Sequence, residues 1–117
     1  MFVRGSVVWA DFGQAVGSES SKRRPAIVVS NNGANLSAWQ GGQGVVTIVP
    51  LTSASRRRYD FQVLIPSSQS GLAKDSIAQA EQVRSVDVRR IAPTAAVLAE
   101  SVMGEISRAL ELHLGLL

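Results

Sequence analysis

Short apolar runs separated by polar segments fill the first three-quarters of the chain and predict β-strands. The runs are rich in Val and Ile and are bounded by Gly, Pro, Ser and Asn, a composition typical of strands that end in turns. The clear runs are residues 7–12, 26–30, 45–51 and 61–65, and weaker ones are residues 76–80 and 88–91. Residues 13–24 and 31–44 are predicted to be loops, and their length favours a functional role.

After Pro93 the apolar residues change to a helical period. They recur at every fourth position, as Leu98, Val102, Ile106, Leu110 and Leu114. This pattern predicts one amphipathic helix over residues 94–114, with Thr94 as its N-cap and the apolar stripe in the core. Five or six strands followed by one helix predict a mainly β fold with a C-terminal α-helix. We expect a small, partly open barrel formed by one domain, residues 1–117.

The amino-acid composition excludes several kinds of catalytic and metal-binding sites. The 117 residues include no Cys and one His, His113. Disulfides, thiol nucleophiles, Cys-type zinc sites and HExxH zinc sites are therefore excluded. The position of His113 close to the C-terminus excludes a Ser-His-Asp triad as well. The absence of Cys suits a reducing cytoplasm. No run approaches the roughly 18 apolar residues of a membrane span, and the N-terminal apolar run is too short for a signal peptide. We therefore expect a cytoplasmic protein with no membrane partner.

Basic residues concentrate in the front half of the chain. Residues 1–58 hold seven Lys and Arg against two acidic residues, whereas the remainder holds five against seven. Ten of the twelve basic residues are Arg, whose planar guanidinium suits recognition of phosphate or carboxylate groups. The alternative is that these charges only keep the protein soluble.

Arg24 and Thr52 are candidate catalytic residues because strand pairing brings them together. If the strands at 26–30 and 45–51 are antiparallel neighbours, the start of one lies beside the end of the other. Pro25 favours an extended backbone at Arg24 and so helps to aim its side chain. A guanidinium beside a hydroxyl can hold a phosphate and stabilise the charge of its transition state. The alternative is a solvated arginine and a strand-end threonine.

Four ordered motifs at these positions resemble the MazF/PemK family of toxin endoribonucleases. They are Val-Gly-Ser-Glu at 16–19, Arg-Pro-Ala-Ile-Val-Val-Ser-Asn at 24–31, Val-Pro-Leu-Thr-Ser at 49–53 and Glu-Gln-Val-Arg-Ser-Val-Asp at 81–87. Residues 4–9 and 71–76 fit as well, so the resemblance extends over about residues 3–114.

The resemblance implies an SH3-like barrel that forms a homodimer and cleaves single-stranded RNA without metal or cofactor. The family's catalytic pair corresponds to Arg24 and Thr52. Its products are a 2′,3′-cyclic phosphate and a 5′-hydroxyl, so the 2′-OH of the RNA is the nucleophile. The implied role is the growth-arresting toxin of a toxin–antitoxin pair, inhibited by an acidic antitoxin peptide that occupies the RNA groove.

The motifs do not identify which residue is the general base. Some family members use an aspartate before Gln, with an arginine two residues ahead, and the matching positions here are Glu81 and Gln79. Glu81 is therefore a candidate base, and the alternatives are an ion pair with Arg84 or a surface carboxylate. The family commonly reads Glu-Gln-x-Gly in the first loop, whereas this chain reads Glu19-Ser20-Ser21-Lys22, which leaves the loop's RNA contacts open.

Polar residues around these motifs are the predicted RNA contacts. They are Ser18, Glu19, Lys22, Arg23, Asn31, Ser53, Arg56, Arg57, Arg58, Gln82 and Arg84. The run Arg56 to Tyr59 either contacts backbone and stacks a base or is a solvated loop. Trp39 is a base-stacking platform, a dimer contact or a lid over the core, and His113 is predicted on the helix surface.

Two functions of other kinds compete with the nuclease hypothesis. One is a non-catalytic toxin of the same fold that poisons a topoisomerase, and the other is a plain RNA-binding barrel. Catalysis needs the pair of Arg24 and Thr52, whereas binding alone does not.

Overall fold

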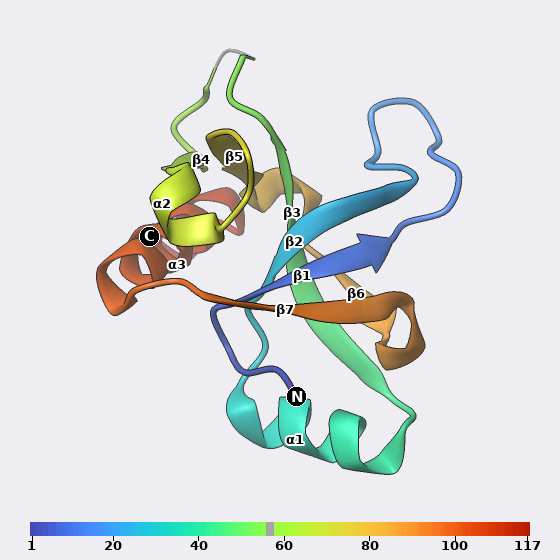
Figure 1. Ribbon diagram of the computed structural model, residues 1–117. Helices are drawn as coiled ribbons and strands as arrows, with labels where there is room; N and C mark the ends of the chain where they lie inside the picture. Colours follow the sequence, from blue (N-terminus) through green and yellow to red (C-terminus); the bar gives the residue numbers. More distant parts are fainter. Residues whose placement is uncertain (56–57) are drawn as a thin grey trace.

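One strongly curved antiparallel sheet runs through the centre of the molecule (Figure 1). The computed structural model describes residues 1–55 and 58–117. The strands pair in the order β4-β5-β3-β2-β1-β7, and β6 pairs with the first half of β3. Their bounds are β1 Ser6–Asp11, β2 Arg23–Val28, β3 Val45–Ser53, β4 Gln62–Ile65, β5 Ser76–Gln79, β6 Arg84–Asp87 and β7 Ile91–Val97. Within the described part of the chain β4 and β7 are not paired with each other, so the sheet does not close.

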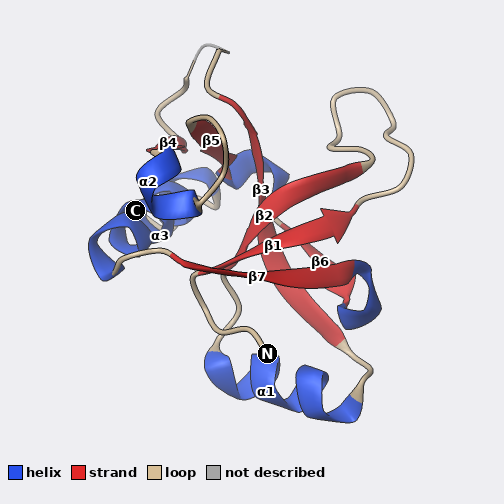
Figure 2. Ribbon diagram, viewed as in Figure 1, coloured by secondary structure: helices blue, strands red, loops and turns tan. Residues whose placement is uncertain are grey.

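Helices lie at two ends of this sheet (Figure 2). Helix α1 Asn32–Gly41 lies at one end, and α2 Ser67–Ser70 and α3 Glu100–His113 lie at the other. Two short 3₁₀ turns, η1 Ala80–Gln82 and η2 Val88–Arg90, flank β6. Among the described residues, none of these helices has the length and apolar character needed to cross a bilayer.

Two apolar cores form because side chains alternate along the strands. In β1, Val7 belongs to a core that β3, β4 and β5 share with α3, whereas Val8 belongs to a core enclosed by β2, β3 and β6. Helix α1 contributes Ala38 to the second core. Alternate side chains of β2 and β3 face the second core, and Arg24 and Thr52 continue these alternate positions. These two residues therefore lie at the edge of the second core.

The predicted fold class is confirmed. The structure is mainly antiparallel β with a C-terminal helix and an open sheet. The predicted strands at 7–12, 26–30, 45–51, 61–65 and 76–80 correspond to β1 to β5 with shifts of one to three residues at most ends. Strong strands are thus found where apolar β-branched residues concentrate.

The prediction of a loop over residues 31–44 is wrong, because α1 occupies most of it. Asn31 caps the helix, and its side chain accepts a hydrogen bond from the Ala34 N–H at 2.9 Å. Gly42 ends the helix in the left-handed conformation, at φ 64°, which glycine adopts readily. The buried Asn35 is held by its own hydrogen bond to the Ser30 carbonyl oxygen at 2.9 Å. Only Asn35 and Ala38 of this helix are buried, so its sequence lacks an apolar period.

The predicted start of the last helix is also wrong. Residues 91–97 form β7, and the Thr94 hydroxyl donates to the Val7 carbonyl oxygen at 2.7 Å instead of capping a helix. Pro93 is compatible with β7 because this strand lies at the sheet's edge. Leu98, Val102 and Ile106 of the predicted stripe are in the core, but Leu114 lies beyond the helix and is exposed.

The predicted strand at 88–91 is wrong as well. Residues 88–90 are the turn η2, with β6 before it and β7 after it. Asp87 caps this turn through a hydrogen bond from the Arg89 N–H at 2.8 Å. Helix α2 was not predicted, since four residues are too few to show a period.

Candidate functional site

Arg24 and Thr52 lie near each other on neighbouring strands, as the sequence predicts. β2 and β3 are antiparallel with Ala26 opposite Pro50 and Val28 opposite Ile48. This pairing ends two residues short of Arg24 on β2 and of Thr52 on β3. Side chains alternate along a strand, so Arg24 and Thr52 project from the same face of the sheet as the pair Ala26 and Pro50.

A cavity of about 310 Å³ contains both residues. We call it the Arg24 cavity; its lining residues are Gly17, Ser18, Glu19, Ser20, Arg24, Thr52, Gln79 and Gln82. The Arg24 Nε donates to the Ser21 carbonyl oxygen at 2.8 Å, which fixes the plane of the guanidinium. No other described residue hydrogen-bonds to its two outer nitrogens. The two outer nitrogens are therefore oriented and available to donate hydrogen bonds to an oxyanion.

The loop between β1 and β2 forms one wall of this cavity through a fixed contact. The Ser20 N–H donates to Gln82 Oε1 at 3.2 Å, and Gln82 Nε2 donates to the Ser18 carbonyl oxygen at 2.7 Å. Glu19 turns its carboxylate back to accept from the Val16 N–H at 2.8 Å. The three predicted contacts Ser18, Glu19 and Gln82 thus meet in one wall.

Glu81 lines a second, adjoining cavity of about 160 Å³. We call it the Glu81 cavity; its lining residues are Ser18, Thr52, Tyr59, Gln62, Ile77, Gln79, Glu81 and Gln82. Gln62 Nε2 donates to Glu81 Oε2 at 2.7 Å. Glu81 Oε1 is buried and has no hydrogen-bond partner among the residues that the structure describes. Burial of a carboxylate oxygen without a hydrogen-bond partner costs folding free energy. Such unsatisfied groups are found at catalytic sites.

The two alternative positions for Glu81 are not what the structure shows. Within the described part of the chain, the one ion pair joins Arg89 to Asp87, so Glu81 is not paired with Arg84. Glu81 is partly buried and not a surface carboxylate. Its role as a base stays a prediction.

Gln62, Gln79 and Ser20 line these cavities and were not among the predicted site residues. All three are buried polar residues, at 9%, 8% and 8% exposure. Gln62 and Gln79 lie directly opposite each other on β4 and β5. The two glutamines could have been found from the sequence, because each is a single polar residue in an apolar strand run, at a position where an apolar core residue is expected.

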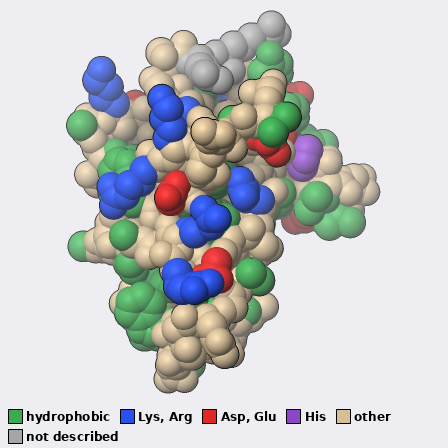
Figure 3. Space-filling view, turned by 90° about the vertical axis from the view of Figure 1, so that its right-hand side faces the viewer, with side chains coloured by type: hydrophobic (Ala, Val, Ile, Leu, Met, Phe, Trp, Pro, Cys, Tyr) green, Lys and Arg blue, Asp and Glu red, His purple; other side chains and the backbone are tan. Residues whose placement is uncertain are grey.

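Other predicted contacts lie outside the two cavities. Arg23 faces the other side of β2, with its guanidinium carbon 5.0 Å from the centre of the Trp9 ring. Asn31 follows the opposite end of β2 and caps α1. Ser53 follows Thr52 but projects away from it, with its Oγ 3.1 Å from Ser55 Oγ. Lys22 and Arg84 are exposed. Lys22 belongs to the loop that Gln82 holds, and Arg84 follows Gln82 by two positions. Figure 3 shows a face of the molecule on which several Lys and Arg side chains gather.

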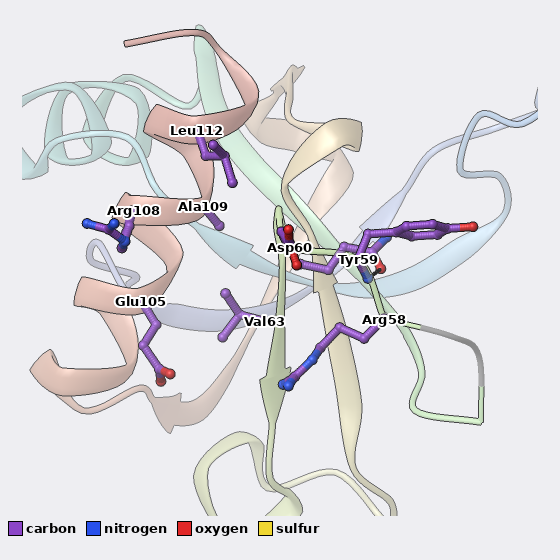
Figure 4. Close-up of a pocket in the computed structure, with 9 residues that line it drawn as sticks. Arg58, Tyr59, Asp60, Val63, Glu105, Arg108, Ala109 and Leu112 are labelled. Atoms are coloured by element: carbon purple, nitrogen blue, oxygen red, sulfur yellow. Dashed lines mark hydrogen bonds between the residues drawn. The ribbon is translucent and has the colours of Figure 1, made fainter. Parts of the chain in front are cut away.

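A third cavity, of about 410 Å³, separates the segment before β4 from α3 (Figure 4). It adjoins the Glu81 cavity, since Tyr59 and Gln62 line both. Arg58 enters from the segment before β4, and Leu112 lies on the α3 side. Of the predicted basic run, Arg58 is thus placed, whereas Arg56 and Arg57 lie outside the described residues.

Trp39 and His113 lie away from the two catalytic candidates. Trp39 packs edge to face on the buried Phe2, with ring centres 5.7 Å apart, and is 41% exposed. This supports its reading as a lid over the second core. His113 is exposed on α3, with its ring centre 6.0 Å from that of Phe61, as predicted.

Lys22 has a backbone conformation that usually requires glycine. Its φ is 63°, and it is the one described non-glycine residue with a positive φ. Hydrogen bonds hold it there: its N–H donates to the Gly13 carbonyl oxygen at 2.7 Å, and its carbonyl oxygen accepts from the Phe12 N–H at 2.9 Å. In the first-loop pattern common in the family that the motifs resemble, Glu-Gln-x-Gly, this position is Gly. This chain therefore has a strained lysine where glycine would adopt the same backbone conformation without strain.

Replacing Lys22 with glycine is expected to stabilise the protein. A side chain in the left-handed region costs about 1 to 2 kcal/mol, and the flexibility of glycine in the unfolded chain offsets part of this. We expect the free energy of unfolding in urea to be about 0.5 to 1 kcal/mol higher for Lys22→Gly than for Lys22→Ala. Both variants lose the charge, and only the alanine retains the strain. Equal stabilities would contradict the assignment of strain to this backbone.

Among the described residues, no group of three or more His, Asp and Glu side chains is placed to hold a metal ion. The residues that line the cavities carry a guanidinium, several hydroxyls, side-chain amides and the Glu81 carboxylate, beside Glu19, whose carboxylate accepts from the Val16 N–H. Such a set can bind a phosphodiester, stabilise added charge on phosphorus and accept a proton.

Comparison with known proteins gives the same family as the motifs. Residues 3–114 match the family described as PemK-like, MazF-like toxin of type II toxin–antitoxin system. The endoribonuclease MazF9 of Mycobacterium tuberculosis is 41% identical over 116 residues, which is 99% of this chain and 98% of that protein.

Solved structures have the same fold. The crystal structure of MazF from Deinococcus radiodurans is 32% identical, with a TM-score of 0.76 over 97% of this chain and 96% of that one. A MazE–MazF structure from the same organism has a chain that is 29% identical, with a TM-score of 0.68 over 97% of this chain and 94% of that one.

Proposed function

The chain belongs to the PemK-like, MazF-like toxins of type II toxin–antitoxin systems and is an endoribonuclease toxin, and we propose that it cleaves single-stranded RNA by using the RNA's own 2′-OH. The proposal assigns the cleavage to Arg24 and Thr52 and requires no metal or cofactor. The products are a 2′,3′-cyclic phosphate and a 5′-hydroxyl.

The placement of Arg24 beside Thr52 is the observation that carries this proposal. Both line one cavity, and the outer nitrogens of Arg24 have no partner among the described residues. A phosphate bound there accepts two parallel hydrogen bonds from the guanidinium and one from the Thr52 hydroxyl. These donors are in place before the reaction, so they stabilise the charge that develops on phosphorus without reorganisation.

The reaction exchanges one ester bond for another. The O2′–P bond forms, the P–O5′ bond breaks, and the 2′-OH proton passes to a base while solvent water protonates the leaving 5′ oxygen. A guanidinium stays protonated in proteins and is a poor proton donor, so the role of Arg24 is to stabilise the pentacoordinate phosphorus.

We assign the proton acceptor to Glu81. Glu81 and Thr52 both line the Glu81 cavity, and Glu81 Oε1 has no hydrogen-bond partner in residues 1–55 and 58–117. Gln62 holds the other oxygen, which orients the carboxylate. Because Oε1 is buried, the assignment requires that substrate binding shifts the side chain toward the 2′-OH.

The proposal extends to location and partners. Absence of Cys favours the reducing cytoplasm. The antitoxin partner rests on family membership and on the MazE–MazF structure of a relative. A homodimer is supported by the exposed apolar residues at the C-terminus, which are Leu112, Leu114, Leu116 and Leu117.

Incubation of the purified protein with a single-stranded RNA in excess EDTA tests the proposed activity. We expect discrete cleavage fragments at unchanged rate with and without the chelator, because no step uses a metal ion. Intact RNA in both reactions would instead favour a toxin that acts by binding, and cleavage that EDTA abolishes would contradict the metal-free mechanism.

A further inference from the structure

Three basic residues from separate segments converge around Asp11 and Phe12, outside the cavities described above. The backbone of Lys22 pairs with that of Phe12, and the Arg84 guanidinium carbon lies 5.5 Å from the centre of the Phe12 ring. Arg90 Nη1 donates to the Asp11 carbonyl oxygen at 3.3 Å. We call these three residues the Phe12 basic cluster.

Among the described residues, no member of the cluster forms an ion pair with a carboxylate. In residues 1–55 and 58–117 the one ion pair joins Arg89 to Asp87, at 3.0 Å. Hydrogen bonds from the side chain and the backbone of Arg89 lower the pKa of Asp87 to about 2, and the charge of Arg90 adds to this lowering. Asp87 is therefore ionised, pairs with Arg89 and offsets part of the charge of Arg90. The Asp11 carboxylate accepts from the Gly13 N–H at 2.9 Å and forms no ion pair. All three members of the cluster are exposed.

The cluster begins where the Arg24 cavity ends. Gln82 lines the cavity and joins its wall to the β1–β2 loop. Arg84 follows Gln82 by two positions, and Lys22 belongs to the same loop that Gln82 holds. A linear ligand that leaves the cavity past Gln82 therefore meets Arg84 and Lys22 next, and Arg90 beyond them.

We infer that the Phe12 basic cluster is a second RNA-binding site, which holds backbone phosphates of the strand beyond the cleaved bond. The inference rests on the proposed function, since it extends the path of the same substrate. Guanidinium groups bind phosphate oxygens in a bidentate manner, and the cluster offers two of them beside an ammonium. The aromatic ring beneath Arg84 is buried, so the cluster contacts backbone and not bases. This gives affinity without sequence selectivity.

Binding of two RNAs at several salt concentrations tests this inference. In every measurement the protein carries the Arg24→Ala change, so that cleavage is slow. One RNA spans only the cleavage site, and the other extends well beyond it on both sides. For the long RNA, Arg84→Ala and Arg90→Ala should each weaken binding several-fold at low salt. Each should also reduce the slope of log K against log salt by about 0.7, the value for one phosphate contact on a single strand. For the short RNA, neither substitution should change affinity.

The control is Lys74→Ala, which removes one positive charge from a separate depression beside Asp75. Its effect on the long RNA should be small, because only overall charge changes. Equal losses for Lys74→Ala and Arg84→Ala, or equal losses on short and long RNA, would overturn the inference. Unchanged RNA affinity with weakened binding of an acidic peptide would reassign the cluster to a protein partner. Binding is measured separately from cleavage, so a parent protein that binds long RNA through this cluster without cutting it would contradict only the proposed activity.

Discussion

Replacing Arg24 with alanine is expected to lower the rate of RNA cleavage by on the order of a hundred-fold to a thousand-fold. Among the described residues, Arg24 supplies the one cation that lines the Arg24 cavity, and Thr52 lines the same cavity. Loss of the guanidinium removes the donor fork that stabilises the pentacoordinate phosphorus. The fold should persist, because the side chain is only partly buried and, within the described part of the chain, makes a single hydrogen bond, to the Ser21 carbonyl oxygen.

The effect should fall mainly on kcat, since the interaction strengthens as charge develops in the transition state. Single-turnover cleavage with excess enzyme measures this directly. Arg24→Lys should recover only part of the rate, because an ammonium keeps the charge but not the planar fork.

Arg23→Ala is the matched control, because it removes the same charge one residue away. Arg23 lies on the opposite face of β2 over the Trp9 ring, so its loss should change the single-turnover rate by no more than a few-fold. Equal losses for Arg23→Ala and Arg24→Ala would show that the overall charge of this segment matters, and not the position of Arg24. Full activity of Arg24→Ala would remove this residue from the mechanism.

Most of the sheet could be predicted because strands carry their own signal. Val7 and Val8 face different cores, and the apolar β-branched runs of β1, β2 and β3 are buried on both sides. Such runs are recognisable from sequence alone. The same pattern fixed the neighbours β2 and β3, and from them the meeting of Arg24 with Thr52.

Elements held by polar contacts could not be predicted in the same way. Helix α1 depends on the Asn31 cap, the Gly42 terminus and the buried Asn35, none of which gives an apolar period. The start of α3 was misplaced because Thr94 and Pro93 resemble a helix start, whereas pairing with β1 draws both into β7. Here long-range pairing overrides the local preference.

The site shows the same division. Arg24 and Thr52 come from neighbouring strands, so local reasoning placed them. Gln62 and Gln79 belong to it through the pairing of β4 with β5 and of β5 with β3, which the sequence did not reveal. The contact from Gln62 to Glu81 spans 19 positions, and only the folded chain shows that this carboxylate has one oxygen held and one without a partner.

Removal of one oxygen atom from the substrate is expected to have a still larger effect than any change in the protein. If the 2′-OH is the nucleophile, an RNA with a single 2′-deoxy nucleotide on the 5′ side of the cleaved bond has no group that can form the O2′–P bond. Cleavage at that bond should stop. Binding should change little, because Arg24 and Thr52 are proposed to contact phosphate oxygens and not the 2′-OH.

The measurement compares this substrate with the all-ribose RNA in EDTA and analyses the ends of the fragments. The mechanism predicts that the all-ribose RNA yields a 2′,3′-cyclic phosphate and a 5′-hydroxyl, and that the 2′-deoxy RNA binds but stays intact at the substituted bond. Cleavage of the 2′-deoxy bond, or fragments with a 5′-phosphate, would show that water or a protein group attacks the phosphorus. Either result would contradict a site in which the RNA supplies the nucleophile and Arg24 and Thr52 stabilise its attack.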